Sequence, residues 1–338
     1  MGNARRRRTP RRTGRPWCGN RERRDLLPAR HHLRRHHLDR VDRARHGPGA
    51  ARRRAADGVV AGAHRIVSAA ATRIVFDHVS VAFRTAGGLL PVVEDVSWSI
   101  ANGEFVSIIG PSGCGKTTMM NMVAGFVQPT TGRVTLDGAA ITGPGPERGV
   151  IFQEYGVFPW LTVEENIAFG LRLRANRAAD DERRATCSRY MQLMGLNEFA
   201  RSFPKTLSGG MRQRLAIARA YAVKPEFLLM DEPFGALDAQ TRSQMQNLLL
   251  DVLQQEEKTV MLITHSVEEA VYLSSRIIVA TARPARIREV IDVPFAYPRE
   301  ESLHESAAFG ELRSHVRDLV MKEYAMQQRQ QGAAAAGH

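Results

Sequence analysis

The stretch "FVSIIGPSGCGKTTMMNMVAGF", residues 105–126, decides the fold of this chain. It opens with a short apolar run that contains β-branched residues, which indicates a buried strand. A glycine-rich loop follows, and the residues from Lys116 onward have the composition of a helix. This order of strand, loop and helix is the context that the pattern G-x-x-x-x-G-K-[ST] requires. We therefore predict a phosphate-binding loop at residues 110–117.

The residue types of this loop suit a nucleotide phosphate. Glycines let backbone N–H groups converge on phosphate oxygens without interference from a Cβ atom. The Lys116 ammonium is expected to reach the β- and γ-phosphates, and the Thr117 hydroxyl to ligate Mg²⁺. Cys114 is interpreted as a small filler and not as a redox residue. The predicted ATP-binding residues are Gly110, Pro111, Ser112, Gly113, Cys114, Gly115, Lys116, Thr117 and Thr118.

The flanking sequence alternates between strand and helix patterns. Residues 73–83 alternate apolar and polar, and "GRVTLDGAAI" (132–141) reads as a hairpin with an Asp-Gly turn. Apolar strands are expected at 149–153, 226–230 and 258–264, and a helical pattern dominates from Thr162 to about Tyr221. Apolar strands that alternate with helices predict a mainly parallel sheet. An antiparallel β region precedes it and a helical insertion interrupts it.

Polar residues follow several of these strands. Asp231 ends the run "FLLM", the place of an aspartate that holds Mg²⁺ through water, and Glu232 could accept a proton from an attacking water. A structural alternative is that Glu232 caps the turn before a proline. Gln153 and His265 end two other strands, and Asp238 lies seven residues after Asp231. Open α/β sheets bind ligands at the carboxyl ends of their strands, so we expect one site there.

A second anion-binding pattern occurs in "LSGGMRQRLAIARA", residues 207–220. A Ser-Gly-Gly turn begins a helix, and Arg212 and Arg214 follow in its first turns. Bare N–H groups at a helix N-terminus attract anions. The chain thus carries two phosphate-binding elements.

Together these motifs resemble the nucleotide-binding subunits of ATP-binding cassette (ABC) transporters, over residues 73–290. The resemblance implies an α/β fold: a P-loop NTPase (RecA-like) core with an antiparallel β subdomain and a helical signature subdomain at about 155–222. It implies that Glu232 is the catalytic base, that His265 contacts the γ-phosphate, and that Gln153 touches Mg²⁺ and the lytic water. The same resemblance assigns adenine stacking to Phe83, the D-loop to Asp238, and the signature to Ser208, Gly209 and Gly210.

One residue departs from the family pattern, because Met211 stands where a glutamine usually follows the two glycines. We expect only a peripheral contact to change. In this family two subunits pack head to tail, and the signature of one closes over ATP held by the phosphate loop of the other. The implied cofactors are ATP and Mg²⁺. The implied partners are a second copy of the chain, multi-span membrane permease subunits and, indirectly, a solute-binding protein.

Three sequence segments resemble the nitrate/sulfonate/taurine importer group more specifically. They are "VFPWLTV" (157–163), the variant "SGGMRQR" and the tail "RPARIREVIDVPFAYPR" (283–299). This implies import of a small anionic solute such as nitrate, taurine or an alkanesulfonate, with heterocyclic vitamins also open. The chain would lie peripherally at the cytoplasmic face of the bacterial inner membrane. Phe158, Pro159 and Trp160 would anchor a helix of the membrane subunit, or else simply pack within the helical insertion.

The positive charge is confined to one end. The 338 residues include 48 Lys and Arg against 35 Asp and Glu, but residues 1–72 hold 20 of the basic and 5 of the acidic residues, leaving 28 and 30. The basicity therefore gives no reason to expect that the body binds nucleic acid. Three irregularly spaced cysteines suit a reducing compartment, and the apolar runs are far shorter than the ~18 residues of a membrane span.

Residues 1–72 show neither helical nor strand periodicity, so we expect a disordered Arg-rich tail. It could also be upstream sequence translated from a mis-assigned start, with the true start at Val59, Val60 or Val67. A nucleic-acid arm, a tether to anionic lipid and a transit peptide are weaker readings, and "HHLRRHH" lacks the spacing of a metal site. The remaining boundaries are an ABC ATPase domain at 73–290 and a C-terminal extension with one helix at 291–338.

The sequence does not favour two other function classes. A soluble ABC ATPase of DNA repair or translation would show two cassettes or a long coiled-coil insertion, and this chain shows neither pattern. A purely structural P-loop protein would not need Glu232 and His265 in addition to the loop.

Overall fold

The computed structural model describes residues 72–256 and 258–336. The Arg-rich tail predicted for residues 1–72 lies outside the described residues except for Thr72, where the first strand begins.

The predicted antiparallel region is a four-stranded sheet with the order β2-β1-β4-β5. Strand β1 (Thr72–Thr85) pairs antiparallel with β2 (Gly88–Ala101) and with β4 (Thr131–Leu136), which pairs with β5 (Ala139–Ala140). Asp137 and Gly138 connect the last two strands with φ values of 50° and 80°. Two successive positive φ angles are those of a type I′ turn, so the predicted Asp-Gly hairpin is confirmed.

The second sheet has six strands in the order β10-β9-β3-β8-β7-β6. All neighbouring pairs are parallel except β10 with β9. Every residue of β3, β7 and β8 is buried, as expected for strands covered on both faces. The bounds are β3 (Phe105–Ile109), β6 (Arg148–Ile151), β7 (Phe227–Asp231), β8 (Thr259–Ile263), β9 (Arg276–Ala280) and β10 (Ile287–Asp292).

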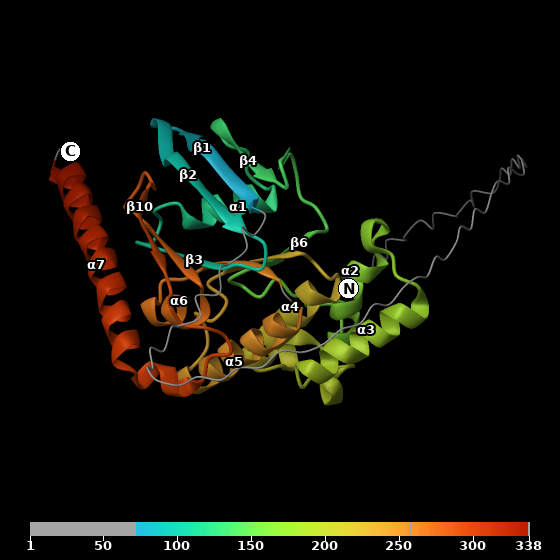
Figure 1. The fold of residues 1–338 in the computed structure, drawn as a ribbon. Coiled ribbons are helices and arrows are strands. Elements are labelled where there is room, and N and C mark those ends of the chain that lie inside the picture. Colours follow the sequence, from blue (N-terminus) through green and yellow to red (C-terminus); the bar gives the residue numbers. More distant parts are fainter. Residues whose placement is uncertain (1–71, 257, 337–338) are drawn as a thin grey trace, which may run out of the picture. The chain divides into compact units, whose positions relative to one another are not determined.

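Seven α-helices accompany the sheets in the described residues (Figure 1). Helix α1 follows the phosphate loop and packs against β2 of one sheet and β7 and β8 of the other. Helices α2, α3 and α4 contact one another and form the predicted helical insertion. The bounds are α1 (Lys116–Ala124), α2 (Val163–Arg172), α3 (Asp180–Leu193), α4 (Gly209–Ala222), α5 (Ala239–Glu256), α6 (Val267–Leu273) and α7 (Ala307–Ala336).

The loop before α2 has a defined shape because polar side chains satisfy its backbone. Thr162 and Glu165 form a reciprocal capping box at the start of the helix. Asn166 is fully buried, accepts a hydrogen bond from Phe158 N, and donates to the carbonyl oxygens of Phe158 and Leu161. These bonds hold the segment that carries Trp160.

The antiparallel and parallel sheets are joined by an ion-pair cluster. The Arg73 guanidinium on β1 bonds Asp137 after β4 and Glu226 before β7, and it stacks over the Phe227 ring with its central carbon 4.8 Å from the centroid. Within the described helices, none is both long and apolar enough to cross a membrane.

Candidate functional site

The phosphate loop begins where β3 ends. It needs glycine where φ is positive and where a neighbouring backbone leaves no space for a side chain. Gly113 and Gly115 have φ values of 71° and 125°, in the region that side chains disfavour. A Cβ atom on Gly115 would also lie 2.8 Å from the Val92 carbonyl oxygen, so no side chain fits there. Lys116 is 5% exposed, and its Nζ donates to the carbonyl oxygens of Gly110 and Pro111 at 2.9 and 2.8 Å. Because an ammonium has three donors, one N–H is left to meet an anion.

Thr117 and Asp231 meet across the two halves of the sequence. The Thr117 Oγ1 lies 3.4 Å from Asp231 Oδ1, at the carboxyl end of β7. The pKa of the Asp231 carboxyl is raised above its usual value, mainly by burial. The Thr117 hydrogen bond and the charge of Lys116 offset only part of this rise. Mg²⁺ in nucleotide sites takes one or two protein oxygens and completes its shell with water and phosphate oxygens. The hydroxyl and the carboxylate fit that donor set.

Glu232 follows Asp231 in a constrained conformation. Its φ is 46°, a left-handed value that costs a non-glycine residue on the order of 1–3 kcal/mol. The backbone holds it there, because Glu232 N donates to Ile263 O at 2.9 Å. Gln153 Nε2 and His265 Nδ1 both lie near the same carboxylate oxygen, Oε2, at 3.3 and 3.2 Å. The structure thus brings together three side chains that lie far apart in the sequence.

Gln153 and His265 lie slightly farther along the chain than the sequence patterns indicate. Strands β6 and β8 end at Ile151 and Ile263, so each side chain follows two residues after its strand. Past β8, the Thr264 hydroxyl donates to buried Glu269 and accepts from Ser266 N, which turns the chain into α6. The two-residue extension places His265 beside Glu232 and outside the sheet.

Asp238 directly precedes α5, where its Oδ1 accepts a hydrogen bond from Thr241 N at 3.0 Å. This backbone bond holds the pKa of the Asp238 carboxyl below its usual value. Thr241 also approaches the signature turn, since a Cβ on Gly210 would lie 2.6 Å from Thr241 Cγ2. The close approach explains why glycine is needed at position 210.

The signature residues open helix α4, as predicted. Ser208 is its N-cap, and the Ser208 hydroxyl accepts from Met211 N at 3.3 Å. The two arginines of the motif have partners within the helical insertion: Arg212 stacks over the Tyr155 ring at 5.5 Å, and Arg214 Nη1 donates to Met194 O. The helix N-terminus itself, more than these side chains, is the anion-attracting feature.

Phe83 lies apart from the carboxylate cluster, on β1 opposite Leu90 near the tip of the β1–β2 hairpin. It is 41% exposed. An exposed ring on this hairpin is available for stacking.

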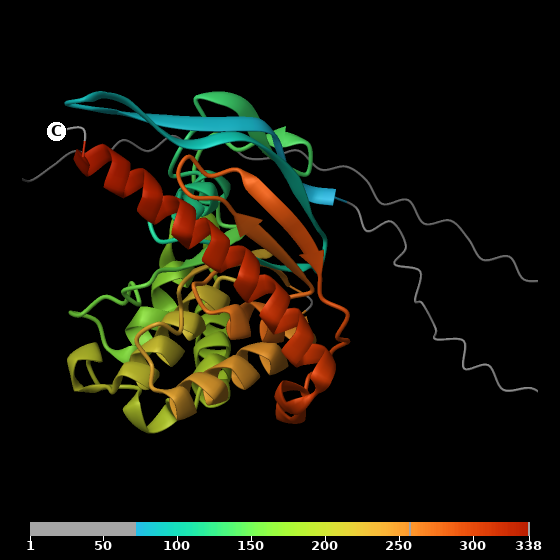
Figure 2. The same cartoon turned by 90° about the vertical axis from the view of Figure 1, so that its left-hand side faces the viewer.

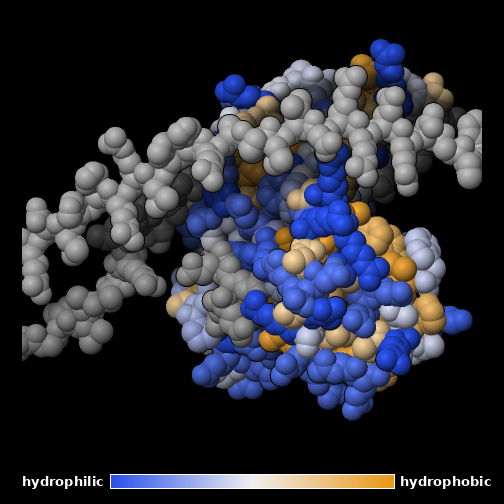
Figure 3. All heavy atoms as spheres, turned by 90° about the vertical axis from the view of Figure 1, so that its right-hand side faces the viewer, coloured by the Kyte–Doolittle hydropathy of each residue, from blue (hydrophilic) through white to orange (hydrophobic). Residues whose placement is uncertain are grey.

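An apolar surface lies between the helical insertion and β6. Trp160 is 69% exposed and tilts against Phe158, which the Arg219 guanidinium covers at 4.1 Å. A pocket of 230 Å³ beside it is lined by residues that include Phe152, Phe169 and Leu173. Figure 3, which faces the side that carries α2 and α3, shows orange hydrophobic patches among hydrophilic surface.

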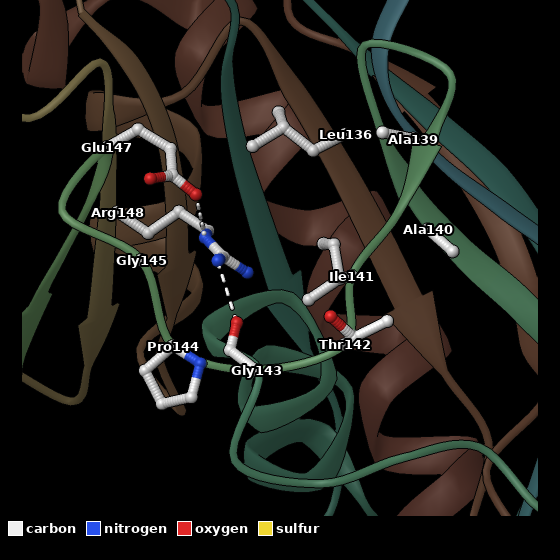
Figure 4. Close-up of a pocket in the computed structure, with 10 residues that line it drawn as sticks. All are labelled: Leu136, Ala139, Ala140, Ile141, Thr142, Gly143, Pro144, Gly145, Glu147 and Arg148. Atoms are coloured by element: carbon white, nitrogen blue, oxygen red, sulfur yellow. Dashed lines mark hydrogen bonds and ion pairs between the residues drawn. The ribbon is translucent and has the colours of Figure 1, made fainter.

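A separate pocket of 320 Å³ lies between β4, β5 and the loop that leads to β6 (Figure 4). It is lined by residues from Leu136 to Arg148 and does not include the predicted site residues. The Arg148 side chain points across it and bonds Glu147, the Gly143 carbonyl and the Val123 carbonyl near the end of α1. We interpret Arg148 as a pin that fixes α1 and this loop.

Sequence reasoning missed one residue at the phosphate loop. Gln327, on α7, donates from Nε2 to the Ser112 carbonyl oxygen at 2.9 Å. The two residues are 215 positions apart, and the only available signal was the glutamine-rich end of the predicted C-terminal helix.

The known proteins that the chain resembles agree with this fold and with these motifs. The family model described as ABC transporter matches residues 93–235. A protein of Brucella abortus named "Putative ATP-binding protein" is 53% identical over 68% of this chain and 87% of its own length. The nitrate import ATP-binding protein NrtD of Synechococcus elongatus is 43% identical over 74% of this chain and 92% of its own. The taurine import ATP-binding protein TauB of Pseudomonas aeruginosa is 46% identical over 73% and 95%.

Among solved structures, the dimeric ATP-binding cassette MJ0796, in a post-hydrolysis state bound to ADP and Pi, matches with a TM-score of 0.58. It is 30% identical, and the match covers 66% of this chain and all of the other. The predicted fold class, an α/β P-loop NTPase core with an antiparallel β subdomain and a helical subdomain, is confirmed.

Proposed function

The chain belongs to the ABC transporter family as an ATP-binding subunit, and from this we propose that it energises import of a small anionic solute such as nitrate, taurine or an alkanesulfonate. Membership makes the chain an ATPase, which converts ATP and water to ADP and phosphate. The observation that carries the proposal is the Glu232 carboxylate held between Gln153 and His265, beside the Thr117–Asp231 pair.

Binding of the triphosphate is proposed to rest on the phosphate loop, from Gly110 to Thr118. The spare donor of Lys116 would contact the β- and γ-phosphates while its other two donors keep the ammonium in place. Thr117 and Asp231, with Gln153, would hold Mg²⁺, which supplies positive charge against the phosphate oxygens. Phe83 would stack on the adenine, since its ring is exposed on the hairpin.

Glu232 is proposed as the general base. Gln153 Nε2 donates to Oε2 and His265 Nδ1 lies 3.2 Å from the same oxygen, so the carboxylate has neighbours that favour one orientation, and the strained backbone of Glu232 is held by a bond to β8. A positioned base of this kind contributes roughly 10²–10⁴ in rate. His265 and Gln153 would align this carboxylate with the lytic water and contact the γ-phosphate side of the site.

The second phosphate-binding element is proposed to serve a neighbouring subunit. Ser208, Gly209 and Gly210 open α4 in the helical insertion, whereas Lys116 opens α1 next to the parallel sheet. A head-to-tail dimer would place the α4 N-terminus of one copy against the γ-phosphate bound to the other, with Asp238 at the same boundary. ATP would close such a dimer, and hydrolysis would open it.

Coupling to the membrane is proposed to use the apolar surface around Trp160. Trp160 is exposed and packs on Phe158, which contacts Phe169 in the wall of the pocket, and an exposed aromatic side chain is the kind of anchor that receives a partner helix. The partner would be a multi-span permease, with a solute-binding protein in the complete importer, and the chain would lie at the cytoplasmic face of the bacterial inner membrane. In domain terms, residues 73–290 would form the ATPase and 291–338 an extension.

Three measurements test this function. Purified chain should hydrolyse ATP in the presence of Mg²⁺, and affinity purification from its native membrane should recover a multi-span protein. The solute-binding protein recovered with the complex is then titrated with nitrate, taurine, alkanesulfonates and a heterocyclic vitamin precursor. Binding of one of the anions supports the proposed solute class. Selective binding of an uncharged heterocycle would contradict it, and a complex without a membrane protein would contradict the importer.

A further inference from the structure

Helix α7 packs on the parallel sheet along one face. Phe309, Val316, Leu319 and Val320 are buried in the same apolar cluster as residues of β9 and β10. Their spacing of three, four and seven residues is that of a single helical stripe. Figure 2 shows α7 crossing the β9–β10 hairpin, and His315 Nε2 lies 3.0 Å from Glu289 Oε1 on β10.

Farther along the same face, α7 carries a buried carboxylate. Glu323 is 2% exposed, and its Oε2 accepts a hydrogen bond from Ala282 N at 3.1 Å. Its other oxygen lies 3.7 Å from Arg288 Nε on β10. Oε1 has no hydrogen-bond partner among the described residues, so the bond from Ala282 N is the specific attachment and Arg288 adds a longer charge contact that partly offsets the cost of burying the carboxylate. Through them α7 holds the turn that connects β9 to β10.

That turn is in close contact with the phosphate loop. Ala285 exchanges backbone hydrogen bonds with Val92 and Glu94, and its Cβ lies 3.3 Å from where a Cβ of Gly115 would be. The carbonyl oxygen of Ala280 lies 2.7 Å from where a Cβ atom of Gly110 would be. A shift of the turn would therefore reach Gly115 directly, and Gly110 only through the end of β9 at Ala280. Burial, with a contribution from the nearby negative charge of Glu323, raises the pKa of Cys114 within the loop.

Helix α7 also reaches the loop directly through the Gln327–Ser112 hydrogen bond. A trans peptide is planar, and its C=O and the next N–H point in opposite directions. Holding the Ser112 carbonyl toward α7 therefore turns the Gly113 N–H away from α7. Gly113 has a φ of 71° and no side chain, so without this bond the peptide unit could rotate easily.

We propose that Gln327 and Glu323 are positioning residues for ATP binding, and that α7 keeps the phosphate loop in its binding conformation. Gln327 orients the Ser112–Gly113 peptide, and Glu323 fixes the β9–β10 turn against Gly110 and Gly115. The proposal rests on the proposed function, because it assumes that the loop binds the ATP phosphates. It assigns a role in nucleotide affinity to a helix outside the predicted ATPase domain.

The test compares Gln327→Ala with Gln328→Ala in the full chain. Gln328 is the adjacent, exposed glutamine on the same helix, so it controls for changes in helix propensity. The Kd for Mg·ATP is measured by calorimetry, kcat and KM by phosphate release, and Tm by thermal unfolding. Loss of one neutral hydrogen bond should raise the Kd and KM of Gln327→Ala by about threefold to tenfold. Its kcat and Tm, and all values for Gln328→Ala, should stay near wild type.

Glu323 supplies an independent arm with a conservative rescue. Glu323→Gln keeps an acceptor for Ala282 N and should bind ATP nearly as well as wild type, whereas Glu323→Ala should show a raised Kd. If Glu323→Ala fails to fold, the comparison of Gln327→Ala with Gln328→Ala still tests the role of α7 in ATP binding.

The results separate the two proposals. A wild-type chain that bound no ATP would overturn both the proposed function and the role of α7. Wild-type binding that Gln327→Ala leaves unchanged, or a loss of kcat at constant Kd, would overturn only the role of α7.

Discussion

The Nδ1 atom of His265 lies 3.2 Å from Oε2 of Glu232. The histidine follows β8 and the glutamate follows β7, two adjacent parallel strands whose carboxyl ends meet at one edge of the sheet. Because Glu232 N also bonds the last residue of β8, both its backbone and its side chain are held by the neighbouring strand segment. A carboxylate positioned in this way is suited to accept a proton from water.

The first prediction removes this base. Glu232→Gln should keep the Kd for Mg·ATP within about threefold and lower kcat to less than about a tenth of wild type, because the phosphate contacts remain while the proton acceptor is lost. The exposed carboxylate variant Glu198→Gln is the matched control and should turn over normally. A Glu232→Gln enzyme that kept more than a tenth of the wild-type kcat would remove Glu232 from the role of base.

The second prediction concerns coupling to the membrane subunits. Trp160→Ala should abolish most solute transport by the assembled importer while the isolated subunit keeps its ATPase activity, since Trp160 is 69% exposed and its ring packs against Phe158. Its Tm should change little. Trp98→Ala is the contrasting variant, because Trp98 stacks on buried Phe76 with centroids 4.7 Å apart and its loss should lower Tm. Equal losses of transport and of isolated ATPase activity in Trp160→Ala would contradict the coupling role.

The third prediction uses the cluster that joins the two sheets. The pKa of Asp137 is lowered from its ordinary 3.8, first by its hydrogen bond to Arg73. A lowered carboxyl pKa adds stability that is fully present above the ordinary value and is lost as pH falls through the folded value. Since the Asp137 side chain is 50% exposed, Asp137→Asn should cost only about 0.5–1 kcal/mol in urea unfolding at pH 6.

This difference between Asp137→Asn and wild type should shrink as the pH falls below 3.8. In an Arg73→Ala background, Asp137→Asn should change the free energy of unfolding less than it does in wild type. That smaller change should not show the same decrease at low pH. A wild-type to Asp137→Asn difference that stayed constant from pH 6 to pH 3 would show that the ion pair contributes nothing.

The fourth prediction removes residues 1–71. The shortened chain keeps Thr72, which pairs with Ala101, and Arg73 with its two carboxylate partners. Its Tm and its ATPase activity should therefore match those of the full chain. A fall in Tm of several degrees would show that the Arg-rich segment stabilises the ATPase domain.

Local sequence patterns were sufficient for the phosphate loop and its surroundings. The glycines of the loop, the apolar run of β3 and the Asp137–Gly138 turn depend on residues that are adjacent in the chain, so their geometry is encoded locally. The carboxylate cluster was also predictable, because Asp231 and Glu232 directly follow a fully buried strand. Parallel strands then bring the other strand ends to the same edge.

Other features depend on tertiary contacts that leave no local signal. The left-handed φ of Glu232 arises from its bond to Ile263, and the Gln327–Ser112 bond joins positions 215 residues apart. The sequence predicted a helix in the C-terminal extension but not its attachment to the phosphate loop. That attachment depends on the packing of α7 against the β9–β10 hairpin.

The central claim is that the signature at Ser208–Gly210 serves ATP bound to another copy, and a crosslinking experiment tests it most directly. Ser112→Cys and Gly209→Cys are placed in separate chains with tags of different size, and also together in one chain. In both arrangements the native Cys18, Cys114 and Cys187 are replaced. Each chain also carries Glu232→Gln so that bound ATP is not hydrolysed. ATP binding in this background is confirmed before crosslinking.

We expect a crosslink between the differently tagged chains that requires Mg·ATP and that ADP does not support. Its formation would place the phosphate loop of one copy against the signature of the other. Crosslinks formed only within the chain that carries both cysteines, and never between chains, would contradict the account.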